Sequence, residues 1–132
     1  MNATTSGIGI SRLGQIAINA QDVERAAAFY AEVLGLTLLF KAPPNLAFFD
    51  CGGVRLMLTR PEKPEFDHPG SILYFAVPDI HAAHGKMKES GARFEDEPHL
   101  IARLPGHDLW MTFFRDSENN LMGLMSEVPK AA

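Results

Sequence analysis

The amino-acid sequence repeats one pattern twice, and this repetition constrains the fold more than any single residue does. In the first copy a strand-like run leads to Asp22, a helix-like run follows, and Gly35 ends it. In the second copy the corresponding residues are Asp79 and Gly91. A repeated unit of this length indicates a duplicated supersecondary module. Two such modules are expected to face each other across a shared cleft.

Each copy continues with a Phe-Phe pair, a turn and an apolar strand. Phe48–Phe49 precedes a Gly52–Gly53 turn in the first copy, and Phe113–Phe114 precedes a polar turn in the second. Adjacent glycines between two apolar runs are typical of a hairpin. We therefore predict an α+β fold in which two β-α-β-β-β modules form a curved mixed sheet around a cleft, with the helices on the outer face.

The length of 132 residues suits one domain with one core. A segment rich in proline and charge separates the two copies, which is typical of a linker. Within the second copy, the stretch 95–106 is interpreted as irregular or as a long hairpin loop. The expected organisation is a single domain at 12–127, made of module one at 12–60, a linker at 61–69 and module two at 70–127, with tails at 1–11 and 128–132.

Both helix-like runs begin at a residue that can cap a helix. Asp22 and Asp79 each carry a carboxylate that can accept hydrogen bonds from the free amides of a first helical turn. In the first run the apolar residues fall on one helical stripe, which we expect to face the core. The members of that stripe are Val23, Ala26, Ala27, Tyr30 and Leu34.

Charge and composition exclude several functional classes. The net charge of −4 does not indicate the positively charged surface that nucleic-acid binding requires. No apolar run approaches the ~20 residues that a membrane span needs, and the first residues lack the basic start and apolar block of a signal peptide. Cys51 is the only cysteine, so no intrachain disulfide can form. We expect a cytoplasmic protein that binds neither nucleic acid nor membrane.

Two segments resemble a known family. The run AFYAEVLGL at Ala28–Leu36 and the run FFRDSENNLMGLMSE at Phe113–Glu127 are similar to the vicinal oxygen chelate superfamily. This superfamily includes glyoxalase I, extradiol dioxygenases and bleomycin-resistance proteins. The resemblance covers roughly residues 12–127 and implies the two-module fold, but this fold hosts many different chemistries.

The resemblance also implies where metal ligands would lie. In metal-dependent members, four ligands come from the first and last strands of the two modules, and here they fall at Gln15, Met57, Ile72 and Gly123. Divalent ions prefer several oxygen or imidazole donors. This set offers one amide oxygen, one thioether and two residues without a side-chain donor. We therefore expect no metal and no other cofactor.

Strand alternation predicts which side chains face the cleft. The resulting surface is apolar with a few polar groups, which suits a small organic molecule. The predicted ligand-binding residues are Gln15, Asn19, Arg55, Met57, Ile72, Tyr74, Trp110 and Gly123.

Two of these residues have alternative interpretations. Arg55 stands opposite Asp50 if the glycine pair forms the turn, so it makes either a cross-strand ion pair or a clamp for a ligand carboxylate. Trp110 shares a strand face with Thr112 and Phe114, and is either a core aromatic or a wall of the cleft.

Histidine and cysteine offer further reactive groups. His81 and His84 lie on the second helix, and we expect them outside the cleft. His99 and His107 lie either at the rim of the cleft or in a solvated loop, and a rim position would let them titrate near a ligand. Cys51 lies in a turn without a strong cationic environment, which argues against a nucleophile.

Three functions remain open at this point. The first is a metal-independent protein that binds a small, mainly apolar organic molecule. The second is a metal-dependent lyase, isomerase or dioxygenase with a degenerate site, and the third is a structural partner of another protein. The residues at the ligand positions favour the first over the second. Relatives with two modules commonly pair and open sheet edges need protection, so we also expect a symmetric homodimer.

Overall fold

The computed structural model describes residues 8–9, 12–61, 64 and 70–130. Most of the expected N-terminal tail, most of the expected linker and the last two residues lie outside this part of the chain. His68 of the linker lies there as well.

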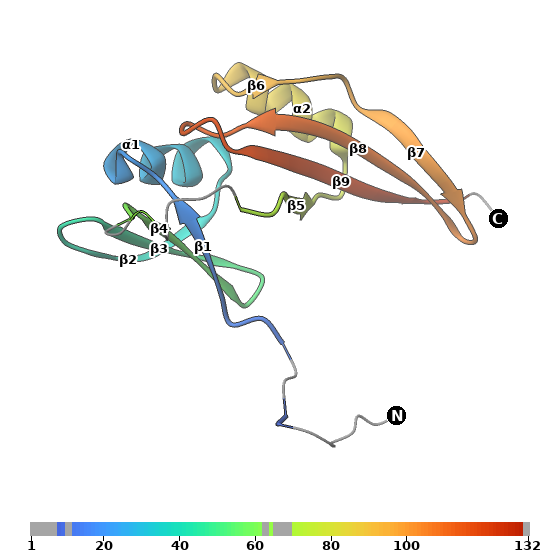
Figure 1. The fold of residues 1–132 in the computed structure, drawn as a ribbon. Coiled ribbons are helices and arrows are strands. Elements are labelled where there is room, and N and C mark those ends of the chain that lie inside the picture. Colours follow the sequence, from blue (N-terminus) through green and yellow to red (C-terminus); the bar gives the residue numbers. More distant parts are fainter. Residues whose placement is uncertain (1–7, 10–11, 62–63, 65–69, 131–132) are drawn as a thin grey trace.

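Module one folds into a four-stranded sheet covered by one helical segment (Figure 1). The sheet order is β1-β4-β3-β2, with β1 parallel to β4 and the other neighbours antiparallel. Its elements are β1 (Gln15–Asn19), α1 (Val23–Ala28), the π-helical segment η1 (Phe29–Val33), β2 (Thr37–Ala42), β3 (Leu46–Cys51) and β4 (Val54–Thr59).

Module two repeats this arrangement. Its sheet order is β5-β9-β8-β6, and β7 also pairs with β8. Since β6 and β7 pair with successive stretches of β8, they act as one interrupted strand. Its elements are β5 (Leu73–Ala76), α2 (Ile80–Glu89), β6 (Arg93–Phe94), β7 (His99–Leu104), β8 (His107–Arg115) and β9 (Leu121–Pro129). The predicted α+β fold of two β-α-β-β-β modules is confirmed, with one sheet for each module.

The second module is more regular than the sequence indicated. The stretch expected to be irregular or a long loop contains β7, which forms a hairpin with β8. A register shift lies between Leu100 and Ala102. Exposure alternates regularly along β7, but the exposed face carries the apolar Ile101 beside His99 and Arg103, so the sequence shows no clear polar–apolar alternation. Strand β9 also continues to Pro129, beyond the expected end of the domain at 127.

Local sequence signals account for the helix starts and for the first hairpin. The Asp22 carboxylate accepts a hydrogen bond from the Arg25 amide at 3.0 Å, and Asp79 accepts one from the Ala82 amide at 3.1 Å. Gly52 and Gly53 have φ angles of 59° and 88°, which only glycine adopts readily. Positive φ at both central residues matches the two-residue turn that joins twisted antiparallel strands.

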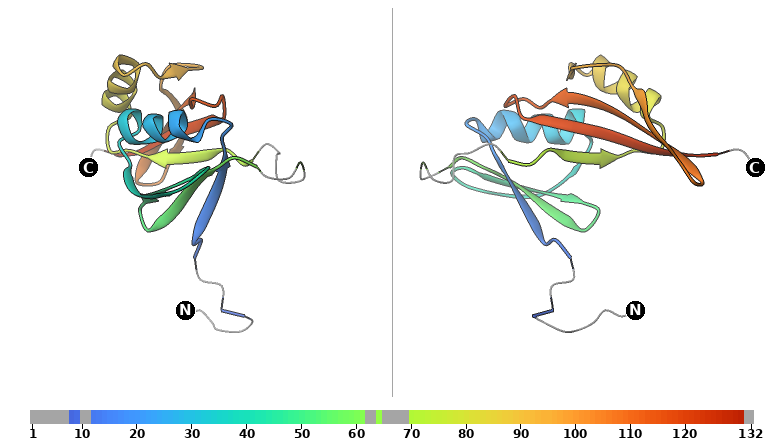
Figure 2. Two further views of the ribbon diagram at one scale, coloured as in Figure 1. Left: turned by 90° about the vertical axis from the view of Figure 1, so that its left-hand side faces the viewer. Right: turned by 45° about the vertical axis from the view of Figure 1, so that its right-hand side comes forward.

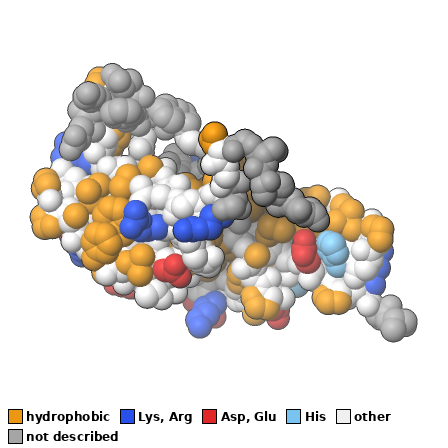
Figure 3. All heavy atoms as spheres, turned by 90° about the horizontal axis from the view of Figure 1, so that it is seen from below, with side chains coloured by type: hydrophobic (Ala, Val, Ile, Leu, Met, Phe, Trp, Pro, Cys, Tyr) orange, Lys and Arg blue, Asp and Glu red, His pale blue; other side chains and the backbone are white. Residues whose placement is uncertain are grey.

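Both helices cover the same side of their sheets, and the opposite sheet faces carry no helix (Figures 1 and 2). The core lies between helices and sheets, where its largest fully buried side chains include Tyr30, Phe49 and Phe114. Figure 3 shows the underside, where hydrophobic side chains gather toward both ends of the view and charged side chains lie between them.

The loop between β8 and β9 docks against module one. The Tyr30 hydroxyl donates a hydrogen bond to Asp116 Oδ2 at 2.8 Å, and the Asn120 side-chain amide donates to the Asn19 carbonyl at 3.2 Å. The Gln21 amide donates to Glu118 Oε1 at 2.7 Å, and the Arg25 guanidinium pairs with the same carboxylate. These contacts fix how the two modules sit relative to one another.

Asp116 is the centre of this junction. It is only 1% exposed. Besides Tyr30, its carboxylate accepts hydrogen bonds from the Glu118 amide at 2.9 Å, the Asn120 amide at 2.8 Å and the Asn120 side chain at 3.0 Å. A buried carboxylate is tolerated only when such donors replace water.

The junction predicts the effect of removing one hydroxyl. We expect Tyr30→Phe to lower the free energy of unfolding by about 1.5–3 kcal/mol, since it removes a hydrogen bond to a buried charged group. The exposed Tyr74 offers a matched control, and Tyr74→Phe should change stability by less than about 0.5 kcal/mol. Urea unfolding of the three proteins measures the difference. Equal stability of Tyr30→Phe and wild type would contradict this role.

Alkaline pH provides a second measurement on the same variant. Burial, with the nearby Asp116 carboxylate, raises the pKa of Tyr30 above its ordinary value. The folded state therefore favours the protonated phenol. The stability that the Tyr30 hydroxyl contributes is complete below the unfolded-state pKa of about 10. It declines as the pH rises above that value. Wild type should lose more unfolding free energy on raising the pH past about 10 than Tyr30→Phe does.

Candidate functional site

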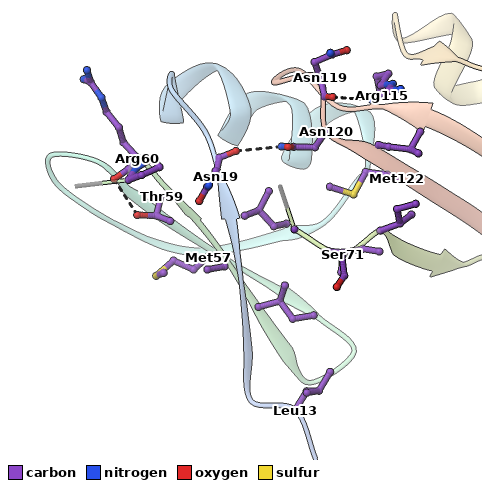
Figure 4. Close-up of a pocket in the computed structure, with 18 residues that line it drawn as sticks. Leu13, Asn19, Met57, Thr59, Arg60, Ser71, Arg115, Asn119, Asn120 and Met122 are labelled. Atoms are coloured by element: carbon purple, nitrogen blue, oxygen red, sulfur yellow. Dashed lines mark hydrogen bonds between the residues drawn. The ribbon is translucent and has the colours of Figure 1, made fainter. Parts of the chain in front are cut away.

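A cavity of about 810 Å³ lies between the two modules (Figure 4). We call it the inter-module pocket. Strand β1, the end of β4, the segment before β5 and the start of β9 contribute to its walls. Its lining residues are Leu13, Ile16–Asn19, Met57, Thr59–Pro61, Gly70–Leu73, Arg115 and Asn119–Met122.

The walls of the inter-module pocket are mostly apolar. Met57 and Ile18 approach from module one, while Ile72 and Met122 approach from module two. Parallel pairing of β1 with β4 sets Ala17 beside Met57 and so brings both strands to one wall. A cavity of this size with apolar walls can bury a small organic molecule.

Polar groups concentrate where the two modules meet. The Asn120 side chain points to the Asn19 carbonyl, as the dashed line in Figure 4 marks. Arg115 donates to the Asn119 carbonyl at 3.2 Å and, through Nε, to Glu95 at 3.2 Å. These bonds hold the Arg115 side chain at the pocket wall and partly neutralise its charge.

Gln15 and Arg55 form a separate cluster on the helix-free face of module one. Arg55 Nε donates to Gln15 Oε1 at 2.7 Å, and Gln15 Nε2 lies 3.7 Å from Met57 Sδ. The guanidinium carbon lies 5.2 Å from the centre of the Phe48 ring, a cation–π distance. Gln15 thereby links Arg55 to one residue of the pocket wall.

Of the two interpretations of Arg55, the ion pair with Asp50 is not what the structure shows. Asp50 does stand opposite Arg55 in the register of β3 and β4, as the turn predicted. In the part of the chain that the structure describes, however, the two side chains form no ion pair. Because β4 lies between β3 and β1, Arg55 can reach in either direction, and it bonds to Gln15 on β1.

A second, smaller hollow of about 300 Å³ adjoins the inter-module pocket. We call it the side hollow. Tyr74 and Phe113 form part of its wall, and their rings meet edge to face with centroids 5.8 Å apart. Beneath Tyr74 lies Gly123, its partner in the register of β5 and β9. Its lining residues are Ile72, Tyr74, Glu95, Phe113, Arg115 and Leu121.

Trp110 lies on the other side of the sheet. Its ring contacts His81 of α2, with centroids 5.3 Å apart, and it packs against the core. The cleft-wall interpretation of Trp110 is therefore wrong, and the core interpretation holds. Both faces of β8 carry apolar residues, so alternation alone does not tell which face meets the helix.

The histidines that the structure describes lie away from the inter-module pocket. His84 is buried against Phe94, and His81 contacts Trp110, so both lie outside the cleft as expected for the outer helix. His99 and His107 begin the two strands of the β7–β8 hairpin, and neither is among the residues that line the described pocket. Burial and the Asp50 carboxylate raise the pKa of the Cys51 thiol, which disfavours a reactive thiolate.

The sequence model of the Glyoxalase/Bleomycin resistance protein/Dioxygenase superfamily matches residues 12–124. The chain belongs to this superfamily. None of the curated protein sequences matches the chain.

Solved structures of the superfamily share this fold. A member from Sphaerobacter thermophilus is 24% identical with a TM-score of 0.74, covering 89% of this chain and 98% of its own. A virulence protein from Salmonella typhimurium is 22% identical with a TM-score of 0.73, covering 92% and 100%. A lactoylglutathione lyase from Agrobacterium tumefaciens is 22% identical with a TM-score of 0.65, covering 89% and 94%. Identities this low show a common fold and do not transfer an activity.

The residues at the superfamily's metal-ligand positions do not fit a divalent ion. The Gln15 amide oxygen already accepts from Arg55, and Met57 supplies only a thioether. A side chain at position 123 would collide with Tyr74. Among the described residues, no three His, Cys, Asp or Glu side chains gather into a group that could hold a metal.

The structure spreads the predicted ligand-binding residues over four places. Asn19, Met57 and Ile72 line the inter-module pocket. Tyr74 and Gly123 belong to the side hollow, with Gly123 beneath the ring. Gln15 and Arg55 form the polar cluster next to Met57, and Trp110 lies on the helix side.

Sequence reasoning missed the contribution of the β8–β9 turn. Asn120 and Met122 line the pocket, and Asn120 also bonds Asp116 and the Asn19 carbonyl. The Asp-Ser-Glu-Asn-Asn run was a usable signal, because Asp and Asn side chains bond nearby backbone in turns. The run predicts an ordered turn, but not the strand of module one that it contacts.

The residues at the four implied metal-ligand positions predict the metal content of the purified protein. We expect no stoichiometric zinc, iron, manganese or nickel, since one engaged amide and one thioether cannot replace the water around a divalent ion. Elemental analysis after purification without chelators measures this, with a metal-dependent glyoxalase I purified in parallel as the control. About one equivalent of metal per chain would contradict the expectation.

Proposed function

We propose that this protein binds a small, mainly apolar organic molecule in the inter-module pocket, without a metal. The observation that carries this proposal is the pocket itself, because its volume of about 810 Å³ lies in the range of small-molecule sites. Its apolar walls favour burial of a hydrocarbon or ring system, at about 25 cal/mol per Å² of apolar area. The amides and hydroxyls at its rim can orient the bound molecule through hydrogen bonds.

Catalysis by a metal-dependent lyase, isomerase or dioxygenase is the alternative. It requires a metal held away from the superfamily's usual ligand positions, which carry Gln, Met, Ile and Gly here. The likeness to a lactoylglutathione lyase is a likeness of fold at 22% identity and lends no support to that activity. We therefore favour binding over catalysis.

We further propose that the protein acts as a homodimer. The helix-free face of module one exposes large apolar side chains, among them Phe40 of the edge strand β2, which is 48% exposed. Open sheet edges and uncovered apolar faces favour pairing with a second copy. We place the protein in the cytoplasm. None of the helices that the structure describes is long and apolar enough to cross a membrane.

If the ligand binds in the inter-module pocket, a larger side chain that fills this pocket should weaken ligand binding. Ala17 lines the pocket from the edge strand β1 and is exposed, so Ala17→Trp should occupy the cavity without disturbing the core. We expect compounds found in a thermal-shift screen to bind this variant at least about tenfold more weakly than wild type. Ala28→Trp, at an exposed position on α1, is the matched control and should bind normally. Unchanged binding by Ala17→Trp would place the ligand elsewhere.

The dimer proposal predicts the mass in solution. Light scattering should give twice the chain mass of 14.5 kDa, with the apolar underside as the driving surface. Phe40→Glu places a charge on that face and should shift the protein toward the monomer. A monomeric wild type at high micromolar concentration would refute the proposal. A wild-type dimer that Phe40→Glu leaves intact would place the interface elsewhere.

A further inference from the structure

Position 123 has no room for a side chain. A Cβ atom added to Gly123 would lie 2.7 Å from Tyr74 Cδ2, closer than real Cβ contacts, and 3.0 Å from Cε2, which is unusually tight. It would also lie 3.4 Å from Phe113 Cε1. Glycine therefore allows the Tyr74 ring to lie directly against the β9 backbone.

Phe113 holds the Tyr74 ring from the side. The two rings meet at 76° with centroids 5.8 Å apart, an edge-to-face arrangement. Although it has contacts with Gly123 and Phe113, Tyr74 remains 44% exposed. A large aromatic ring that is held in place and still open to solvent can receive a second ring.

The exposed ring faces a surface that continues into the inter-module pocket. Tyr74 lines the side hollow, which shares Ile72, Arg115 and Leu121 with that pocket. A ligand in the pocket can therefore extend a group over Tyr74 without leaving the protein surface. Arg115 and Glu95 are the charged groups at this edge, and they are bonded to each other.

Gly123 also stands at a metal-ligand position of the superfamily, where a coordinating side chain would be needed. The Tyr74 ring occupies the space that such a side chain would fill. We propose that the Gly123–Tyr74 pair forms a stacking surface for a planar aromatic group of the ligand. This inference rests on the proposed function, because it names the class of molecule that the same site takes.

Two matched probes test the inference. 2-Naphthoate and decalin-2-carboxylate have the same charge and a similar size, but only the first is flat and aromatic. Wild type should bind 2-naphthoate about tenfold more tightly than the saturated acid, as measured by calorimetry. In nitrogen-15 NMR spectra, only the naphthoate should cause ring-current shifts at the Leu121 and Gly123 amides.

Variants of the pair separate stacking from simple burial. Tyr74→Phe keeps the ring and should keep the preference for naphthoate, whereas Tyr74→Leu should lose it. Gly123→Ala displaces the ring and should weaken naphthoate binding in wild type. In the Tyr74→Leu background, where no ring is present, Gly123→Ala should have no further effect. Folding of each variant is checked by its NMR spectrum.

Several results would overturn the inference. Equal binding of the two acids, or no binding of either at about 1 mM, would exclude a stacking surface. A Tyr74→Leu variant that keeps the preference would do the same. If Ala17→Trp abolishes binding of both acids while Tyr74→Leu changes neither, the proposed function stands and the stacking surface fails. Conversion of a wild-type dimer to a monomer by Tyr74→Leu would identify Tyr74 as a subunit contact and also refute the inference.

Discussion

The buried Asp116 carboxylate is the interaction on which the rest of the structure depends. It lies 86 residues from Tyr30 in the sequence, yet the two side chains meet at 2.8 Å. A carboxylate that is 1% exposed would be very unfavourable without its four hydrogen-bond donors. Because three of those bonds come from Glu118 and Asn120, the same carboxylate orders the β8–β9 turn and docks it on module one.

The candidate site follows from that docking. Asn120 reaches the carbonyl of Asn19 at the end of β1 and closes one end of the pocket, while Met122 enters its wall. Neither module possesses the pocket alone, since its walls come from β1 and β4 on one side and from β5 and β9 on the other. The positions at which the resemblance implies metal ligands have different surroundings in the two modules. Gln15 is engaged by Arg55 in module one, and Tyr74 covers Gly123 in module two.

Much of the fold could be read from short-range signals. Asp22 and Asp79 cap their helices as expected, and Gly52–Gly53 forms the predicted turn. The errors occurred where a local pattern was compatible with two arrangements. Trp110 lies on a strand with apolar residues on both faces, and the exposed face of β7 includes the apolar Ile101.

The sequence by itself determined the duplicated modules, their helix starts and the tight turn of the first hairpin. These features depend on residue type and on neighbours a few positions apart, where backbone geometry leaves few choices. Only the tertiary structure decided that Arg55 bonds Gln15 instead of Asp50, that Trp110 meets α2, and that the Tyr74 ring lies on Gly123. Each of those outcomes depends on which strands and helices become neighbours, and that is settled by packing across the whole chain.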